Sequence, residues 1–207
     1  RVSLLMGKAR DLGADQLLIS DENMIGSARH SVRSGRLFPA IGERMARFGA
    51  SFGGRVTQVV LTIRQTDHWW ASALAYTVGR GHPVPDADQI DRIAHDRRGW
   101  RDVITDLACA LPEAKISIAR YDDYAGRPDA LFTQLTGRAA PATTQDYWLN
   151  RRPDEASLRA QMGPDAAGLR SDGLGNWHPF SDAQAAAVPL AGLTAWQGLV
   201  VAGGIAE

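Results

Sequence analysis

The sequence predicts an α/β fold in which helices cover a mostly parallel β-sheet. Strand-like and helix-like segments alternate through residues 1–124, the pattern of repeated strand–helix–strand units. The segment 55–64, RVTQVVLTIR, is a continuous β-branched run, typical of a parallel strand buried on both faces. The chain has 207 residues, which suits a single domain over 1–207.

Three segments are predicted strands, and each is followed by unusual polar residues. The strand 16–20 leads into SDEN, the strand 55–64 into RQTDH, and the strand region 114–124 contains RYDDY. In open parallel sheets, ligands bind beyond the carboxyl ends of the strands. We therefore expect these polar groups to lie along one edge of the sheet.

Helical periodicity, capping residues and terminal glycines predict the remaining elements. The predicted helical regions are 1–12, 35–54, 67–80, 87–112 in two pieces, 127–137, 153–163 and 180–201. Asp67 is a candidate N-cap for its helix. Pro189 must break or bend the last region.

The composition of the chain argues against several classes of protein. The chain carries 23 basic and 23 acidic residues, so it lacks the basic excess of a nonspecific nucleic-acid binder. It holds one cysteine, Cys109, which favours a buried small apolar residue over a disulfide or zinc ligand. We predict no metal site, no membrane span and a cytoplasmic protein.

Arg64 and Ser72 form the first candidate site. Arg64 ends the buried strand 55–64, and Ser72 lies on the following helix. A forked, permanently charged guanidinium together with a hydroxyl suits a phosphate group. The alternative is an ordinary surface pair between Arg64 and Asp67, beside an unremarkable helical serine.

Three segments together resemble the nucleotide-binding motifs of sulfotransferases that use 3′-phosphoadenosine 5′-phosphosulfate (PAPS). Arg64 and Ser72 keep the spacing of that family's 3′-phosphate motif. YDDYAGRP (121–128) is similar to its Tyr-Glu-Asp-Leu-x-x-x-Pro segment, and RSDGLGNW (170–177) to its late Arg-Lys-Gly-x-x-Gly-Asp-Trp loop. Each motif is weak alone, but the three occur in the family's order. The resemblance covers roughly residues 16–181 and is closest to bacterial sulfotransferase-like proteins.

The resemblance implies a three-layer fold of the P-loop nucleotide-kinase type, with PAPS as sulfuryl donor. It implies that Arg64, Ser72 and Arg170 bind the 3′-phosphate, that Tyr121 lies near the adenine, and that Gly175 belongs to the loop closing over the nucleotide. It also implies a small-molecule, glycan or lipid acceptor.

The chain departs from the family pattern in two places. Ser171, Asp172 and Asn176 replace the Lys, the first Gly and the Asp of the late loop. The family's 5′-phosphosulfate loop, a Lys-[Ser/Thr]-Gly-Thr turn after the first strand, is not found. Because the sequence starts at Arg1 rather than Met, we expect an N-terminal strand and loop to be missing from it. The alternative is a protein that lacks this loop and does not transfer sulfuryl groups.

Glu22 is the first candidate for the base that accepts the acceptor's proton, because it follows a strand at the predicted ligand edge. His30, in a predicted polar loop, is the second. A helix N-terminal acid is an equal explanation for Glu22, and Asp21 is a possible N-cap. The rival functions are an inactive nucleotide-binding or interaction module on the same fold, and a phosphoryl-transfer enzyme, which would need a Gly-rich loop and Mg²⁺ ligands.

Overall fold

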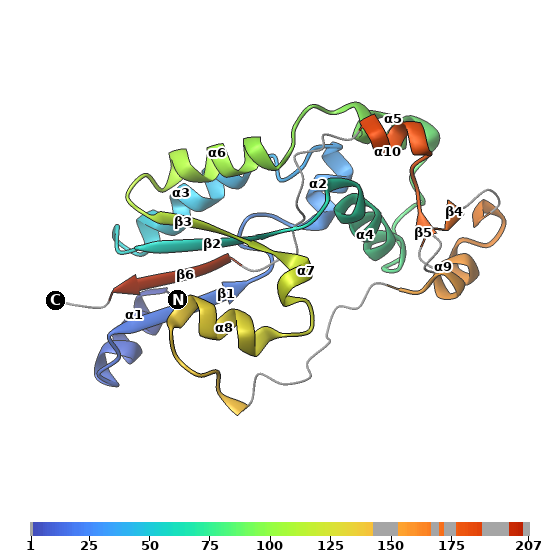
Figure 1. Cartoon of the computed structure of the whole chain (residues 1–207). Helices are drawn as coiled ribbons and strands as arrows, with labels where there is room; N and C mark the ends of the chain where they lie inside the picture. Colours follow the sequence, from blue (N-terminus) through green and yellow to red (C-terminus); the bar gives the residue numbers. More distant parts are fainter. Residues whose placement is uncertain (1, 143–152, 167–169, 172–176, 188–198, 205–207) are drawn as a thin grey trace.

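A computed structural model of the chain describes residues 2–142, 153–166, 170–171, 177–187 and 199–204 (Figure 1). Its centre is a four-stranded sheet in the order β1-β6-β2-β3. The strands are β1 (Gln16–Asp21), β6 (Leu199–Gly204), β2 (Gln58–Ile63) and β3 (Lys115–Arg120). The predicted α/β class is therefore confirmed at the level of mixed helices and strands.

The sheet is less parallel than the sequence predicted. β2 and β3 pair in parallel, whereas β6 runs antiparallel to both of its neighbours, β1 and β2. The prediction of a helix through 180–201 was wrong at its end, because Leu199, Val200 and Val201 belong to β6. Leucine and valine suit either a buried helix or a buried strand, and pairing between two existing strands decides the outcome here.

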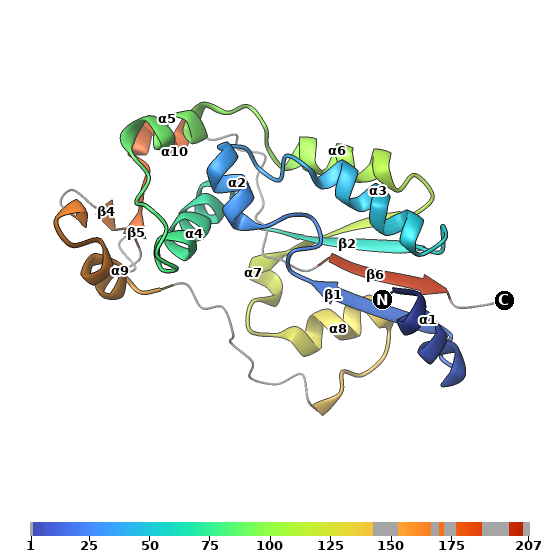
Figure 2. The same cartoon turned by 180° about the vertical axis from the view of Figure 1, so that it is seen from behind.

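Helices cover both faces of the sheet (Figures 1 and 2). α3 (Ile41–Ser51) and α6 (Trp100–Ala110) lie together on one face, and α1 (Val2–Asp11) and α8 (Pro128–Thr136) lie on the other. The face under α3 and α6 holds much of the hydrophobic core. Its fully buried members include Ile41, Met45, Val59, Val103 and Leu107.

The remaining elements gather beyond the carboxyl ends of β2 and β3 (Figure 1). They are α2 (Ala28–Ser34), α4 (Thr66–Val78), α5 (Ala87–His95), α7 (Tyr121–Tyr124), α9 (Glu155–Met162), η2 (Gly163–Ala166), β4 (Arg170–Ser171), β5 (Trp177–His178) and α10 (Asp182–Ala187). α4 packs against α2, α9 and β5. This end of the molecule therefore carries the residues that the sequence marked for ligand binding.

Several local predictions need correction. The helix predicted over 35–54 begins only at Ile41, and α2 occupies 28–34, so His30 lies on a helix rather than in a loop. Ser27 caps α2 with its side chain, which leaves Asp21 no N-cap role. The strand predicted over 114–124 ends at Arg120, where α7 begins.

Two further predictions about single residues were wrong. Asp67 is not the N-cap of α4, because the helix starts at Thr66 and Gln65 holds the cap position without a side-chain hydrogen bond. Cys109 is exposed on α6 rather than buried. Trp69 and Trp70, which are adjacent in the sequence, are both buried, at 4% and 2% exposure.

Within the described residues, no helix combines the length and apolarity that a membrane crossing requires. The same part of the chain contains no group of three or more His, Cys, Asp or Glu side chains arranged to hold a metal ion.

Candidate anion-binding site

The register of two parallel strands places Arg64 beside Tyr121. The last aligned pair of β2 and β3 is Ile63 with Arg120, so Arg64 and Tyr121 are the first residues after the two strands. The Arg64 guanidinium carbon lies 5.0 Å from the centroid of the Tyr121 ring. A cation over an aromatic face at this distance is attracted by the ring's negative face. Two of the three predicted motifs thus meet at one edge of the sheet.

The Arg64 side chain retains an unused donor. Its Nε is buried, and no described residue accepts a hydrogen bond from it. A buried donor without a partner costs about 1–3 kcal/mol. A ligand oxygen that reached Nε would remove this cost and form a charge-assisted hydrogen bond.

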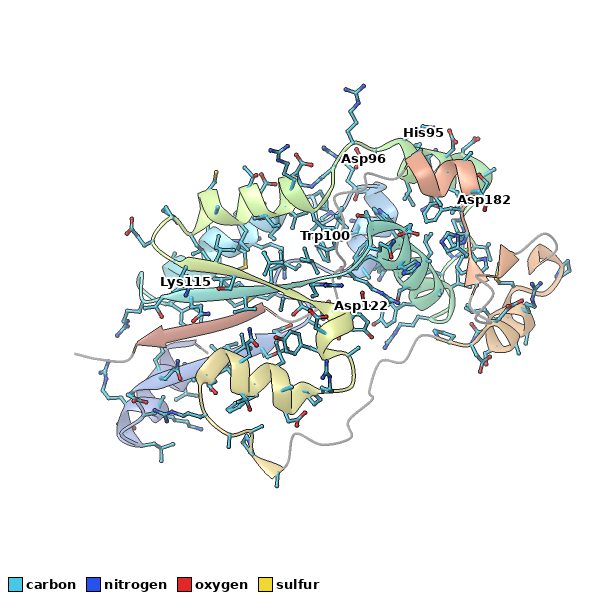
Figure 3. The ribbon with its side chains drawn as sticks, viewed as in Figure 1. His95, Asp96, Trp100, Lys115, Asp122 and Asp182 are labelled. Carbon is cyan, nitrogen blue, oxygen red and sulfur yellow. The ribbon has the colours of Figure 1, made fainter. Side chains whose placement is uncertain are left out.

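Aromatic packing fixes the backbone of Arg64. Trp100, which is 1% exposed, donates from its indole Nε1 to the Arg64 carbonyl oxygen over 3.0 Å. Its ring packs against Phe38 and Trp69, with centroid distances of 5.8 and 6.3 Å. Figure 3 shows Trp100 and Asp122 near the end of the sheet where α4 and α7 begin. The backbone of Arg64 is therefore held in place by a buried, closely packed tryptophan.

Asp67, three residues after Arg64, is shared by two histidines. The Nε2 atoms of His68 and His178 lie 3.8 and 3.7 Å from the Asp67 Oδ2. Among the described residues, no ion pair joins Asp67 to Arg64. The surface pair between Arg64 and Asp67, the simplest alternative for Arg64, does not form in this structure.

The pKa of Asp67 is lowered despite its burial. Burial alone would raise the pKa, but the His178 side chain 3.7 Å away and the backbone N–H of His68 lower it, and the charges of the two histidines lower it further. The net direction shows that the carboxylate is stabilised in its charged form. Asp67 thus holds a fixed negative charge between two imidazoles.

The late motif reaches α4 through His178. β5 packs against α4, and in the β4–β5 pair His178 aligns with Arg170 while Trp177 aligns with Ser171. Asp67 therefore connects the Arg64 segment to the strand paired with Arg170. Gly175, the other predicted nucleotide-binding residue of this motif, lies outside the described residues.

Ser72 lies on the same helix as Asp67 but farther along it. It is half-buried on α4, about 9 Å along the helix axis from Thr66 at a rise of 1.5 Å per residue. Its hydroxyl has no hydrogen-bond partner among the described side chains and loops, and no described contact joins it to Arg64. The structure leaves Ser72 available without placing it against the guanidinium.

Glu22 lies across β6 from Arg64, whereas His30 is on α2, which packs against α4. Glu22 is in the turn after β1, and β6 separates β1 from β2, so two strand spacings, about 10 Å, lie between those strands. A ligand contacting both Arg64 and Glu22 would have to extend over this width. His30 is exposed on α2, and its backbone N–H donates to the capping Ser27 Oγ over 3.3 Å.

An arginine that the sequence analysis missed holds the Glu22 turn. Arg44 on α3 donates from Nη2 to the Asn23 carbonyl over 2.6 Å and from Nε to the Met24 carbonyl over 3.0 Å. The Asp21 side chain accepts from the Asn23 N–H over 2.7 Å, which closes the turn locally. These contacts span about twenty residues of sequence, so no local pattern could have revealed them.

The described part of the chain also contains two shallow hollows. One, of about 240 Å³, is lined by small and apolar residues, among them Ala46, Gly49, Val56, Leu111 and Ala114. Val56 precedes β2 and Ala114 precedes β3, so this hollow is at the opposite end of the sheet from Arg64. The other, of about 270 Å³, lies beside Arg44, Arg47, Phe48 and Ser51.

The chain was compared with protein families, curated proteins and solved structures. No protein-family model, no curated protein and no solved structure matches the chain. The class that fold and site define is an α/β protein with a candidate anion site at the carboxyl edge of its sheet.

Proposed function

We propose that this chain is a PAPS-dependent sulfotransferase domain. The observation that carries the proposal is Arg64, whose buried Nε has no described partner while its guanidinium stacks on Tyr121. In the proposed complex, Arg64 binds the 3′-phosphate of PAPS and the Tyr121 ring lies near the adenine. Ser72, Arg170 and the Gly175 segment contribute further contacts to the same nucleotide.

The three predicted motif segments support this assignment by their positions. β2 and β3 place the first two side by side, and the contact between His178 and Asp67 brings the third to the same helix terminus. The finer fold assignment, a three-layer P-loop nucleotide-kinase type sheet, belongs to the proposal. β1, β2 and β3 run in one direction, as that fold requires, whereas the antiparallel β6 is a departure from it.

The chemistry follows from sulfuryl transfer. An acceptor hydroxyl or amine attacks the sulfur of PAPS, its proton passes to the Glu22 carboxylate, and the bond from sulfur to the bridging phosphate oxygen breaks. Adenosine 3′,5′-bisphosphate leaves. Arg44 holds the turn that carries Glu22, so a base at this position is preorganised. The acceptor is a small molecule, a glycan or a lipid, and the proposed compartment is the cytoplasm.

A second candidate is an inactive nucleotide-binding or interaction module on the same fold. Such a module would need no Lys-[Ser/Thr]-Gly-Thr turn, whereas sulfuryl transfer needs this turn to surround the transferred group with N–H donors and a lysine. Both candidates require the Arg64 site and differ in whether sulfuryl transfer occurs.

Both candidates require that the Arg64 site binds a nucleotide, and thermal stabilisation by adenosine 3′,5′-bisphosphate tests this. A ligand that binds only the folded protein raises its melting temperature, and at about 100 times the Kd the gain is about 2.7 kcal/mol. We expect the shift in the parent protein and its loss in Arg64→Ala.

Arg80→Ala is the matched control for this test. Arg80 also stacks on a tyrosine, Tyr76, at 4.5 Å, but at the opposite end of α4. The shift should survive in this variant. No shift in the parent protein at saturating ligand, or an equal loss in both variants, would overturn the proposal. Transfer of radiolabelled sulfate from PAPS to a panel of acceptors then separates the enzyme from the inactive module.

A further inference from the structure

His178 lies between two oxygen acceptors. Its Nδ1 is 3.3 Å from the Phe180 carbonyl oxygen, and its Nε2 is 3.7 Å from the Asp67 Oδ2. A neutral imidazole carries one N–H and can donate to only one of them, whereas the imidazolium donates to both. The side chain is 16% exposed, so water offers it limited help. The protonated form can therefore donate toward both oxygens at once, which the neutral form cannot.

The carboxylate that His178 faces stays charged across the range in which histidine titrates. The pKa of Asp67 is lowered, although burial opposes this, because the nearby His178 side chain and the backbone N–H of His68 stabilise the charged form. Histidine changes charge near neutral pH. Between about pH 6 and pH 8, the strength of the contact is thus set by the imidazole and not by the acid.

The contact joins two parts of the chain that are distant in sequence. Asp67 is in the first turn of α4, three residues from Arg64, and His178 is on β5, aligned with Arg170 on β4. His68 contacts both members of the pair: its Nε2 lies 3.8 Å from the Asp67 Oδ2, and its ring centroid lies 6.4 Å from that of His178. Arg170 is the charged residue on the strand paired with β5.

We propose that Asp67 and His178 form a proton-dependent latch that docks the β4–β5 pair against the start of α4 and so sets where Arg170 lies relative to Arg64. Protonation of His178 strengthens the latch. The consequence for nucleotide affinity rests on the proposed function, whereas the latch itself exists without a ligand. His178 and Asp67 are positioning residues in this account.

Hydrogen exchange in the ligand-free protein tests the latch directly. After correction for intrinsic exchange rates, we expect the backbone amides of β4 and β5 to be more protected at about pH 6 than at pH 8, by roughly three- to fivefold, the size typical of a partly exposed ion pair. His178→Gln and Asp67→Asn should remove this pH dependence.

His68→Gln should keep the pH dependence and is the matched control. Its side chain is 45% exposed and touches the same carboxylate, but from α4 itself. Equal protection at both pH values in the parent protein, or a pH dependence that survives in His178→Gln, would overturn the latch.

A double-mutant cycle tests the effect on the ligand. We expect Arg170→Ala to weaken binding of adenosine 3′,5′-bisphosphate about tenfold in the parent protein but less than threefold in a His178→Gln background, because the arginine is then no longer held in place. Equal losses in both backgrounds would refute the positioning role while leaving the nucleotide site intact. If the parent protein does not bind the nucleotide, the proposed function fails, and hydrogen exchange alone decides the latch.

Discussion

The guanidinium carbon of Arg64 lies 5.0 Å above the Tyr121 ring because the two residues follow the last aligned pair of β2 and β3. Their relative position is set by the hydrogen-bond register of two parallel strands rather than by flexible loops. The indole of Trp100 adds a hydrogen bond to the Arg64 carbonyl oxygen. The candidate anion site is thus built on the sheet itself, and rigid elements position functional groups better than loops do.

Changing Tyr121 tests the role of its ring face. Tyr121→Phe keeps an aromatic face under Arg64, and we expect nucleotide affinity to stay within about twofold of the parent's. Tyr121→Leu removes the face and should lower the free energy of unfolding by about 0.5–1 kcal/mol together with the affinity. Urea denaturation and ligand titration measure the two effects. Equal affinity in the two variants would show that the ring face has no role.

Trp100→Phe removes the donor to the Arg64 carbonyl. Leaving that oxygen without its partner should lower the free energy of unfolding by about 1–3 kcal/mol, and a less fixed Arg64 should also weaken anion binding. Trp70→Phe is the control. Trp70 is also buried, at 2% exposure, and packs edge-on against Trp69, but no described hydrogen bond links its indole to Arg64. If both variants lose the same affinity, the hydrogen bond does not support the site.

Asp67→Asn tests the acid dependence of stability. Because the folded state lowers the pKa of Asp67 below its ordinary value of 3.8, the stabilisation is present above that pH and is lost as pH falls through the folded pKa. The parent protein should therefore be more stable than the variant near neutral pH, and the difference should shrink in acid. Melting temperatures as a function of pH measure it. If the difference in melting temperature grew as pH falls, the predicted direction of the pH dependence would be wrong.

Glu22→Gln and His30→Gln separate the two candidate bases. If Glu22 accepts the acceptor's proton, its replacement should reduce kcat by about 10²–10⁴-fold while nucleotide affinity is kept, because a general base acts mainly in the transition state. His30 is exposed on α2, and we expect its replacement to change kcat little. The rate of sulfuryl transfer to a working acceptor gives both values. The reverse pattern would assign the base to His30.

Local sequence patterns predicted β1, β2 and β3 and most helices because their signals are local. The β-branched run 55–64 appears as β2, whose residues Val59–Ile63 are all buried, and the split of 87–112 appears as α5 and α6. The β6 strand escaped prediction because LVVAGG has no strand-specific alternation. Its partners, 16–21 and 58–60, lie far away in the sequence.

The sequence predicted the part of the candidate site that lies at the ends of the strands. Arg64 and Tyr121 were expected at one edge, and the parallel register brings them into contact. The contacts of Asp67 with His178 and of Arg44 with the Glu22 turn could not be predicted, because both depend on how distant segments pack. Such contacts leave no spacing signature in the chain.

The central claim is that Arg64 binds a 3′-phosphate, and calorimetric titration with two nucleotides tests it most directly. Adenosine 3′,5′-bisphosphate and adenosine 5′-monophosphate differ only in that phosphate. We predict that the parent protein binds the bisphosphate at least about tenfold more tightly, a difference of about 1.4 kcal/mol, and that Arg64→Ala removes the preference while Arg80→Ala keeps it. Equal affinity of the parent protein for both nucleotides, or a preference that persists in Arg64→Ala, would contradict the account.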